Sequence, residues 1–192
     1  MNFRESYKKE IVPKLKEKFG YQNGLEAPRL VKVTLNVGFG RQAKEKQYID
    51  KVVDGLTRIT GQRPILTKAK KSVSAFKIRQ GMVIGSAVTL RGGRMYDFME
   101  KLINISFPRV RDFRGISEKV VDRTGNMTIG FREHLSFPEI KADEVENVFG
   151  LEVCLTTTAN SREEGLELFR LMGFPFKKEE GEEGKKHKKK SK

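Results

Sequence analysis

Hydrophobic residues recur along this chain with two different periods, and each period predicts a different element. Close to the N-terminus they lie four residues apart, as in an amphipathic helix, at Phe3, Tyr7, Ile11, Leu15 and Phe19. Pro13 lies inside this stretch and predicts a kink or two short helices. In residues 31–37, valine and leucine alternate with Lys32, Thr34 and Asn36. This alternation predicts a strand with one buried face and one polar face.

The rest of the pattern predicts a mixed series of helices and strands. A helix through residues 49–56 ends at Gly61, a short strand covers 63–67, and a basic loop covers 68–74. Strands at 75–79 and 82–91 flank a turn at Gln80-Gly81, and a helix follows at 95–102. Residues 106–126 lack a clear period, 150–158 form a strand, and a last helix opens at Ser161 with Glu164 at capping-box spacing. This mixed order favours an α+β fold, with a largely antiparallel sheet packed by helices on one face.

Charge is distributed unevenly along the chain. The net charge is +14, yet residues 55–96 contain no Asp or Glu and nine Lys or Arg. Residues 133–170 are the reverse, with nine acids and three bases, a net charge of −6. Clustered bases without acids are typical of phosphate binding, so we expect a nucleic-acid partner. After Phe176 the composition changes to Lys, Glu and Gly, which predicts a single domain at 1–176 and a disordered tail at 177–192.

Motifs for catalysis, metals and membranes are few. No apolar run approaches the roughly 20 residues of a spanning helix, and the single cysteine, Cys154, excludes an internal disulfide and a Cys-based metal cluster. Gly38-Phe39-Gly40-Arg41-Gln42-Ala43 has the GxGxxA spacing of a dinucleotide site. Lys68, however, stands where the ribose-binding acid belongs, which favours a tight turn. His134 and Cys154 are interpreted as structural residues. We therefore expect no enzyme activity, no cofactor and no metal.

The polar face of the predicted sheet is the candidate binding surface. Alternation places Lys32, Thr34 and Asn36 together, and Thr89 with Arg91 on one side of the long strand. Such side chains suit phosphates, sugar hydroxyls and base edges of structured RNA. Phe76 lies in the acid-free segment, where it could stack on a base or pack into the core beside Ile78.

Several ordered motifs give the chain a close resemblance to the bacterial-type ribosomal protein L five family. They include Gly61-Gln62-Arg63-Pro64, Lys70-Lys71-Ser72, Phe76-Lys77-Ile78-Arg79-Gln80-Gly81, Val88-Thr89-Leu90-Arg91-Gly92 and Phe107-Pro108-Arg109-Val110-Arg111-Asp112-Phe113-Arg114-Gly115. Phe137-Pro138-Glu139-Ile140 and Thr157-Thr158-Ala159-Asn160 follow in the same order. The match runs from the first helix to Pro175-Phe176.

The resemblance implies a monomeric structural protein with the L five fold, of RRM-like or ferredoxin-like topology, in the central protuberance of the large subunit of a cytoplasmic ribosome. It implies partners in 5S rRNA, 23S rRNA, neighbouring central-protuberance proteins, the elbow of the P-site tRNA, and small-subunit protein S thirteen. By motif, 5S rRNA binding falls on Asn36, Gln62, Phe76 and Thr89, and the charge of the acid-free segment adds Arg63 and Arg91. The tRNA-contacting loop is Lys70, Lys71, Ser72, Lys77 and Arg79, and the acids predicted for the protein bridge are Glu139, Asp143, Glu144 and Glu146.

The chain departs from the family pattern at a few positions. Ala87 stands where relatives usually have Lys, and Met127 replaces the usual aromatic residue. Two other interpretations compete with the ribosomal one: a basic RNA-binding or chaperone-like protein outside the ribosome, and a dinucleotide-dependent reductase.

Overall fold

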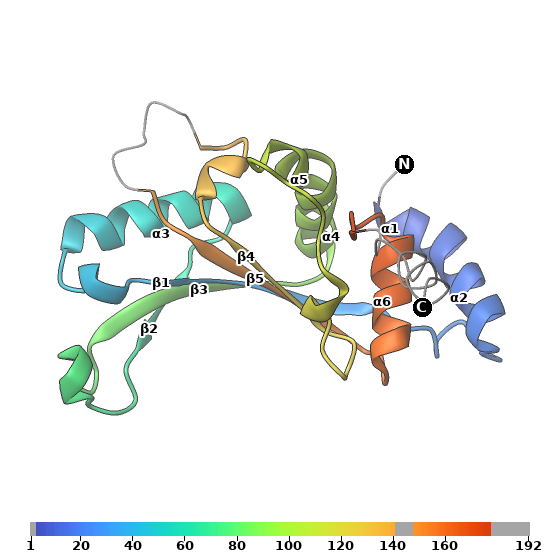
Figure 1. Cartoon of the computed structure of the whole chain (residues 1–192), viewed down its shortest axis with the longest axis horizontal. Helices are drawn as coiled ribbons and strands as arrows, with labels where there is room; N and C mark the ends of the chain where they lie inside the picture. The colour runs from blue at the N-terminus through green and yellow to red at the C-terminus, as the bar shows by residue number, and fades with distance from the viewer. Residues whose placement is uncertain (1–2, 141–147, 178–192) are drawn as a thin grey trace, which may run out of the picture.

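The computed structural model describes residues 3–140 and 148–177. The described residues form one five-stranded sheet with the order β2-β3-β1-β5-β4, in which every neighbouring pair is antiparallel (Figure 1). Its strands are β1 (Leu30–Gly38), β2 (Ile65–Lys68), β3 (Val83–Leu90), β4 (Met127–Phe131) and β5 (Leu151–Thr157). This arrangement confirms the predicted α+β class with an antiparallel sheet.

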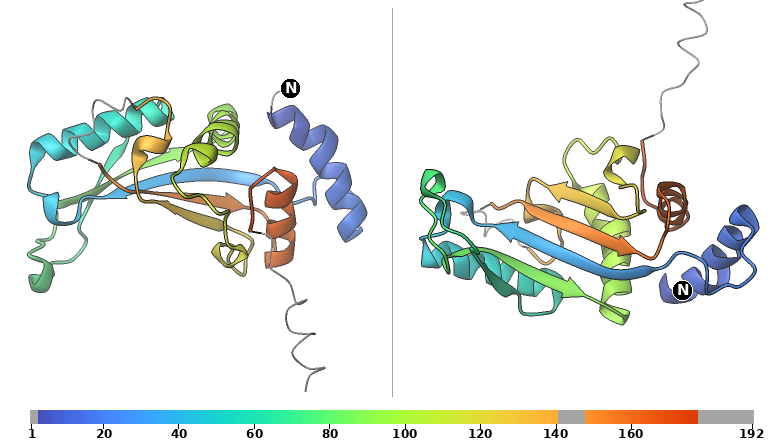
Figure 2. Two further views of the ribbon diagram at one scale, coloured as in Figure 1. Left: turned by 45° about the horizontal axis from the view of Figure 1, so that its top comes forward. Right: turned by 90° about the horizontal axis from the view of Figure 1, so that it is seen from below.

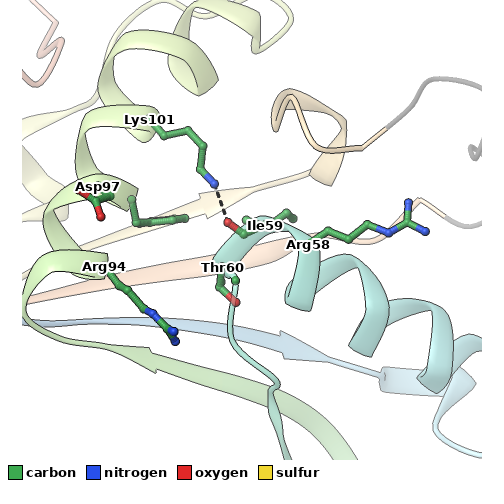
Figure 3. Close-up of a pocket in the computed structure, with 8 residues that line it drawn as sticks. Arg58, Ile59, Thr60, Arg94, Asp97 and Lys101 are labelled. Atoms are coloured by element: carbon green, nitrogen blue, oxygen red, sulfur yellow. Dashed lines mark hydrogen bonds between the residues drawn. The ribbon is translucent and has the colours of Figure 1, made fainter.

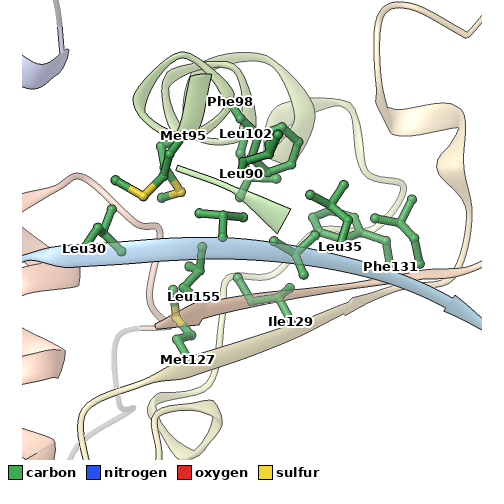
Figure 4. Close-up of a cluster of buried hydrophobic side chains, with 14 of the residues drawn as sticks. Leu30, Leu35, Leu90, Met95, Phe98, Leu102, Met127, Ile129, Phe131 and Leu155 are labelled. Carbon is green, nitrogen blue, oxygen red and sulfur yellow. The ribbon is translucent and has the colours of Figure 1, made fainter. Parts of the chain in front are cut away.

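Helices cover one face of the sheet and leave the other open. Helix α3 (Lys46–Thr60), helix α4 (Gly93–Lys101) and the short α5 (Phe107–Arg109) lie over the same face (Figure 2). Leu35, Leu90 and Leu155 of the sheet meet Phe98 and Leu102 in the core beneath them (Figure 4). This core explains the alternation of hydrophobic and polar residues in β1, because only every second side chain of the strand is removed from water.

A second group of helices lies at the end of the sheet where β1 begins. It comprises α1 (Phe3–Ser6), α2 (Val12–Phe19) and α6 (Arg162–Leu171). A π-helical turn, Tyr7–Ile11, joins α1 to α2 immediately before Pro13, so the predicted interruption is confirmed. Proline has no N–H to donate, and the widened turn accommodates that loss.

The predicted helix ends are also confirmed. Gly61 closes α3 in the left-handed conformation, with φ of 65°. At the start of α6, Ser161 accepts a hydrogen bond from the Glu164 N–H, and the Glu164 carboxylate accepts one from the Asn160 N–H. The first bond satisfies an amide group that the first turn of α6 leaves without a partner, and the second ties the residue before the N-cap to the helix.

Two expectations about local structure are wrong, and one strand was not predicted. Residues 75–79 are not a strand: a 3-10 turn covers Ser74–Phe76, and Lys77 takes a left-handed backbone, with φ of 53°. The helix that begins at α4 continues through a π-helical turn, Leu102–Ser106, into α5, because Pro108 lies in the first turn of α5, where proline is tolerated. Strand β4 was not predicted, although Met127, Ile129 and Phe131 alternate with exposed residues.

Candidate RNA interface

The open face of the sheet presents hydroxyl, amide and amino groups. In β1, Thr34 lies between Thr89 of β3 and Cys154 of β5. Asn36, two residues further, lies between Ala87 and Glu152. The right-hand view of Figure 2 looks onto this face, which no helix of the described residues covers. The predicted polar face is therefore present, with Glu152 as an acid in its middle.

Asn36 and Thr89 are available to a partner. Both are exposed, and neither side chain forms a hydrogen bond within the described part of the chain. The Gln62 side-chain amide donates to the Thr89 carbonyl at 3.4 Å, which ties the turn after α3 to the end of β3. Arg63 follows Gln62 and Arg91 follows β3, and both are exposed. Five of the six residues predicted for 5S rRNA binding thus belong to the open face or the turns next to it.

Phe76, the sixth, lies apart from them, in the long β2–β3 hairpin that projects from the sheet (Figure 1). Its side chain is 75% exposed, so packing into the core is excluded. An exposed phenylalanine suits stacking on a base.

The hairpin loop around Phe76 is ordered by its own backbone. Val73 and Ile78 exchange N–H···O bonds of 2.9 and 3.1 Å, and the Ser72 hydroxyl accepts a bond of 2.9 Å from the Gln80 N–H. The other residues predicted for the tRNA-contacting loop, Lys70, Lys71, Lys77 and Arg79, are exposed around this closed turn. Ser72 therefore maintains the shape of the loop, while the cations are presented outward.

Most cations of the acid-free segment form no ion pair within the described residues, and Arg58, which pairs with Asp54, is the exception. Lys9, Lys18, Lys101 and Arg170 each form an ion pair with a carboxylate. Within the described residues, no ion pair is formed by the following members of the acid-free segment: Arg63, Lys68, Lys70, Lys71, Lys77, Arg79, Arg91 and Arg94. A cluster of like charges without internal counterions is a surface suited to a polyanion.

Of the acids predicted for the protein bridge, Glu139 is engaged inside the molecule. Its carboxylate accepts a hydrogen bond of 2.6 Å from the Lys101 ammonium, which also donates to the Ile59 carbonyl at 2.5 Å (Figure 3). The pair links α4, the end of α3 and the segment after β4. Asp143, Glu144 and Glu146 lie outside the described residues.

The other candidate sites have structural explanations. His134 is buried, stacks on Phe149 at 3.9 Å and accepts a hydrogen bond from the Phe149 N–H, and burial lowers its pKa. The strand before the GxGxxA motif, β1, pairs only with antiparallel neighbours, so the βαβ unit of a dinucleotide fold is absent from the described sheet. Gly40, with φ of 53°, makes the predicted tight turn. No group of metal-ligating side chains and no helix capable of spanning a membrane is found in residues 3–140 and 148–177.

One exposed residue of this surface was missed from the sequence. Ile65 of β2 pairs with Ala87, which in turn pairs with Asn36, and its side chain is 68% exposed. The register of β2 with β3 places Ile65 on the open face, and the sequence Ile65-Leu66-Thr67-Lys68 has no alternation that would have indicated it.

Two family models match the chain in succession. Residues 23–79 match the model described as "Ribosomal protein L5", and residues 83–176 match the model of the C-terminal part of the same ribosomal family. The chain belongs to the ribosomal protein L5 family. The two matched segments meet in the β2–β3 hairpin, yet β3 from the second lies between β2 and β1 from the first, so both build one sheet.

Individual relatives agree along most of their length. The chain is 54% identical over 172 residues to "Large ribosomal subunit protein uL5" of Halothermothrix orenii, covering 90% of this chain and 96% of the relative. Proteins of the same name from Desulforapulum autotrophicum and Lacticaseibacillus casei are each 53% identical over 174 residues, covering 91% of this chain and 97% of theirs.

These matches confirm the resemblance and the predicted place in the large ribosomal subunit. The family is one of structural ribosomal proteins, so the chain is not an enzyme, and the reductase interpretation and the extraribosomal one are both wrong.

Proposed function

We propose that the open sheet face and the cations next to it bind 5S rRNA, and that this contact anchors the chain in the central protuberance. The observation that carries the proposal is the proximity of two kinds of group. Within residues 3–140 and 148–177, the side chains of Asn36 and Thr89 form no hydrogen bond, and those of Arg63 and Arg91 form no ion pair. Structured RNA requires both, because its phosphates supply affinity while its sugars and base edges supply position.

The two kinds of group predict different salt dependences. Replacing Arg63 or Arg91 by Gln is expected to flatten the slope of log affinity against log salt by about one, since one phosphate contact is lost. Replacing Asn36 and Thr89 together by Ala is expected to weaken binding by roughly 1–3 kcal/mol without changing that slope. Arg123→Gln is the control, since Arg123 is an exposed base in the turn before β4. Binding of 5S rRNA that is indifferent to salt, or unaltered in the double variant, would contradict the proposal.

Cys154 provides a direct test of which face is covered. It is the single cysteine of the chain, and it is partly exposed beside Thr34 on the open face. Saturating 5S rRNA is expected to slow alkylation of its thiol several-fold, and the Asn36→Ala, Thr89→Ala variant is expected to need more RNA for the same protection. An unchanged alkylation rate in the complex would place the RNA elsewhere.

We also propose that the projecting hairpin contacts the P-site tRNA elbow. Its cations lie at the tip of a closed turn, away from the end of the sheet that holds Arg91. Neutralising Lys70, Lys71 and Lys77 together is expected to weaken P-site tRNA retention on ribosomes while 5S rRNA binding is retained. Ser72 is left intact because it orders the loop. Loss of 5S rRNA binding with normal tRNA retention would reassign the hairpin.

Phe76 is predicted to bind 5S rRNA, although it lies at the tip of the hairpin. The Phe76→Ala variant distinguishes the two RNAs. Lower affinity for isolated 5S rRNA would support the prediction, whereas weaker tRNA retention alone would assign Phe76 to the tRNA contact. Contacts with 23S rRNA, with neighbouring proteins and with S thirteen complete the proposed role.

A further inference from the structure

A cleft of about 360 Å³ lies between the last turn of α3 and the first turns of α4 (Figure 3). Its walls include Arg58, Thr60 and Gly61 from the α3 side and Arg94, Asp97 and Lys101 from α4. Three of these side chains are cations and one is an acid, so the lining has an excess of positive charge. Neither the predicted RNA contacts nor the predicted bridge includes this cleft.

Most of the polar groups in the cleft are already engaged by the fold. Lys101 is bonded to Ile59 and Glu139, and the Thr60 hydroxyl donates to the Leu56 carbonyl at 2.6 Å. Arg58 pairs with Asp54 at 2.8 Å.

Arg94 is the exception. It is exposed and forms no ion pair within the described residues, although Asp97 lies one helical turn away. Figure 3 shows its side chain extending from the start of α4 toward the turn after α3, below Thr60. A guanidinium offers five N–H donors in a planar fork that matches phosphate oxygens. Arg94 is therefore the cation in this cleft that is free to bind a ligand.

The cleft is continuous with the proposed RNA surface. Gly61 lines it, and the next residue, Gln62, reaches the Thr89 carbonyl at the end of β3. In the segment after β3, only two glycines separate Arg91, next to the open face, from Arg94 in the cleft. Residues 61–62 and 91–94 thus connect the open face with the cleft around the edge of the sheet, and neither segment contains an acid.

We propose that the RNA bound on the open face extends around this edge and places a backbone phosphate in the α3–α4 cleft, where Arg94 binds it. The inference rests on the proposed 5S rRNA binding and extends its footprint to the helical side. The carboxylate of Asp97 repels a phosphate bound in the cleft, so Asp97 lowers the affinity for RNA.

The test is a salt titration of the full chain with 5S rRNA. Arg94→Gln is expected to flatten the slope of log affinity against log salt by about one, and Arg94→Lys to retain most of that slope. Asp97→Asn is expected to tighten binding about two-fold by removing an exposed like charge. Arg123→Gln, with the same loss of charge beside the edge strand β4, three strands away from β3, is expected to leave the slope unchanged.

The possible results separate this inference from the proposed function. An Arg94→Gln variant with the wild-type slope, while Arg91→Gln flattens it, would overturn the cleft and leave the sheet face intact. Wild-type slopes in both variants would overturn both. Weaker RNA binding by the Asp97→Asn variant would also overturn the phosphate contact. It would show that the Asp97 carboxylate accepts hydrogen bonds from a base edge, so that a base and not a phosphate occupies the cleft.

Discussion

The side chain of Asp122 organises the turn that precedes β4. One of its carboxylate oxygens accepts hydrogen bonds from the Thr124 N–H, the Thr124 hydroxyl and the Asn126 N–H, at 2.8 to 2.9 Å. The other accepts from the Asn126 side-chain amide at 3.1 Å. Asn126 in turn accepts a bond of 2.9 Å from the Thr157 N–H, so one carboxylate fastens the turn to β5.

This carboxylate predicts a pH-dependent contribution to stability. Burial raises the pKa of Asp122, but the hydrogen bonds from Asn126 and Thr124 outweigh it and leave the pKa below its ordinary value. A lowered pKa in the folded state stabilises the fold above the unfolded pKa, and that contribution is lost as the pH falls through the folded value.

Asp122→Asn is therefore expected to lower the free energy of unfolding by about 1 kcal/mol at neutral pH, and by progressively less in acid. Urea denaturation at several pH values measures the difference. Glu10→Gln, at an exposed helical position, is the control. A deficit that stays constant into strong acid would show that the ionised carboxylate is not its cause.

Ala87 permits a test by gain of charge. It is half-buried on the open face between Ile65 and Asn36, at a position where the family resemblance predicts Lys. Ala87→Lys is expected to steepen the salt dependence of 5S rRNA binding by about one, because it adds a phosphate contact. Leu25→Lys adds the same charge in the loop before β1, where the side chain is 91% exposed. Equal steepening by both variants would mean that net charge, and not the sheet face, determines binding.

Among the elements, α6 is fixed by an unusually close contact between two glycines. A Cβ placed on Gly165 would lie 2.4 Å from the Cα of Gly125, in the turn that Asp122 organises. Alanine would improve the helix propensity of α6 by about 1 kcal/mol. Overpacking of this kind typically costs about 1–3 kcal/mol, so the steric effect should be the larger.

Gly165→Ala is accordingly expected to lower the free energy of unfolding by about 1–2 kcal/mol, measured by thermal or urea denaturation. Gly130→Ala is the matched control, because a Cβ at Gly130 in β4 meets no atom within 4 Å. A stabilised Gly165→Ala variant would show that the backbone of the turn yields at little cost.

The elements that could be predicted from the sequence are those whose period is imposed by the core. The alternation of β1 and the helical period of α3 both reflect burial in the core, so the type of each element and its buried face were predictable. Phe76 and Ile78 alternate with polar residues in the same way, yet the left-handed Lys77 and the Val73–Ile78 bridge make a turn there. The hydrogen bonds that close the turn, and not burial in the core, determine the conformation of residues 75–79.

The candidate site was predictable to a similar extent. Asn36 and Thr89 were placed on one face by alternation alone. The contact of Gln62 with Thr89, the pairing of Glu139 with Lys101 and the unpaired state of Arg94 depend on strand register and on the packing of α4 against α3. The spacing of residues along the chain does not specify these.

At the scale of the whole molecule, the acids and the bases of the chain form different kinds of contact. Several acids of residues 133–170 are engaged internally: Glu167 pairs with Lys18 at 2.6 Å, and Glu139 pairs with Lys101. Arg170 pairs with Glu118, before β4. These pairs join α2 to α6 and connect α4 and α6 to segments before and after β4, whereas most bases of residues 55–96 form no ion pair within the described residues. These acids thus help to hold the fold together, while most bases of residues 55–96 remain available for the proposed RNA contact.

This division changes how the proposed bridge to S thirteen should be tested. Glu139→Gln would weaken an internal pair as well as a surface charge, so it should be omitted from the variant. Changing Asp143 to Asn, and Glu144 and Glu146 to Gln, removes three acids from the segment that the resemblance assigns to the bridge. Charges at the rim of an interface act mainly through steering, and salt screens them.

The triple variant is therefore expected to leave 5S rRNA binding unchanged and to weaken association of the two ribosomal subunits, more clearly at low salt. Sedimentation of reassociated subunits over a salt series measures the effect. The matched control replaces Glu10, Glu17 and Glu163, three exposed acids of the N-terminal helices and α6, by Gln. It removes the same charge, so an equal loss of association in both triple variants would trace the effect to net charge. Impaired 5S rRNA binding in the first triple variant alone would instead place residues 143–146 at the RNA interface, because only a segment close to RNA could change that affinity.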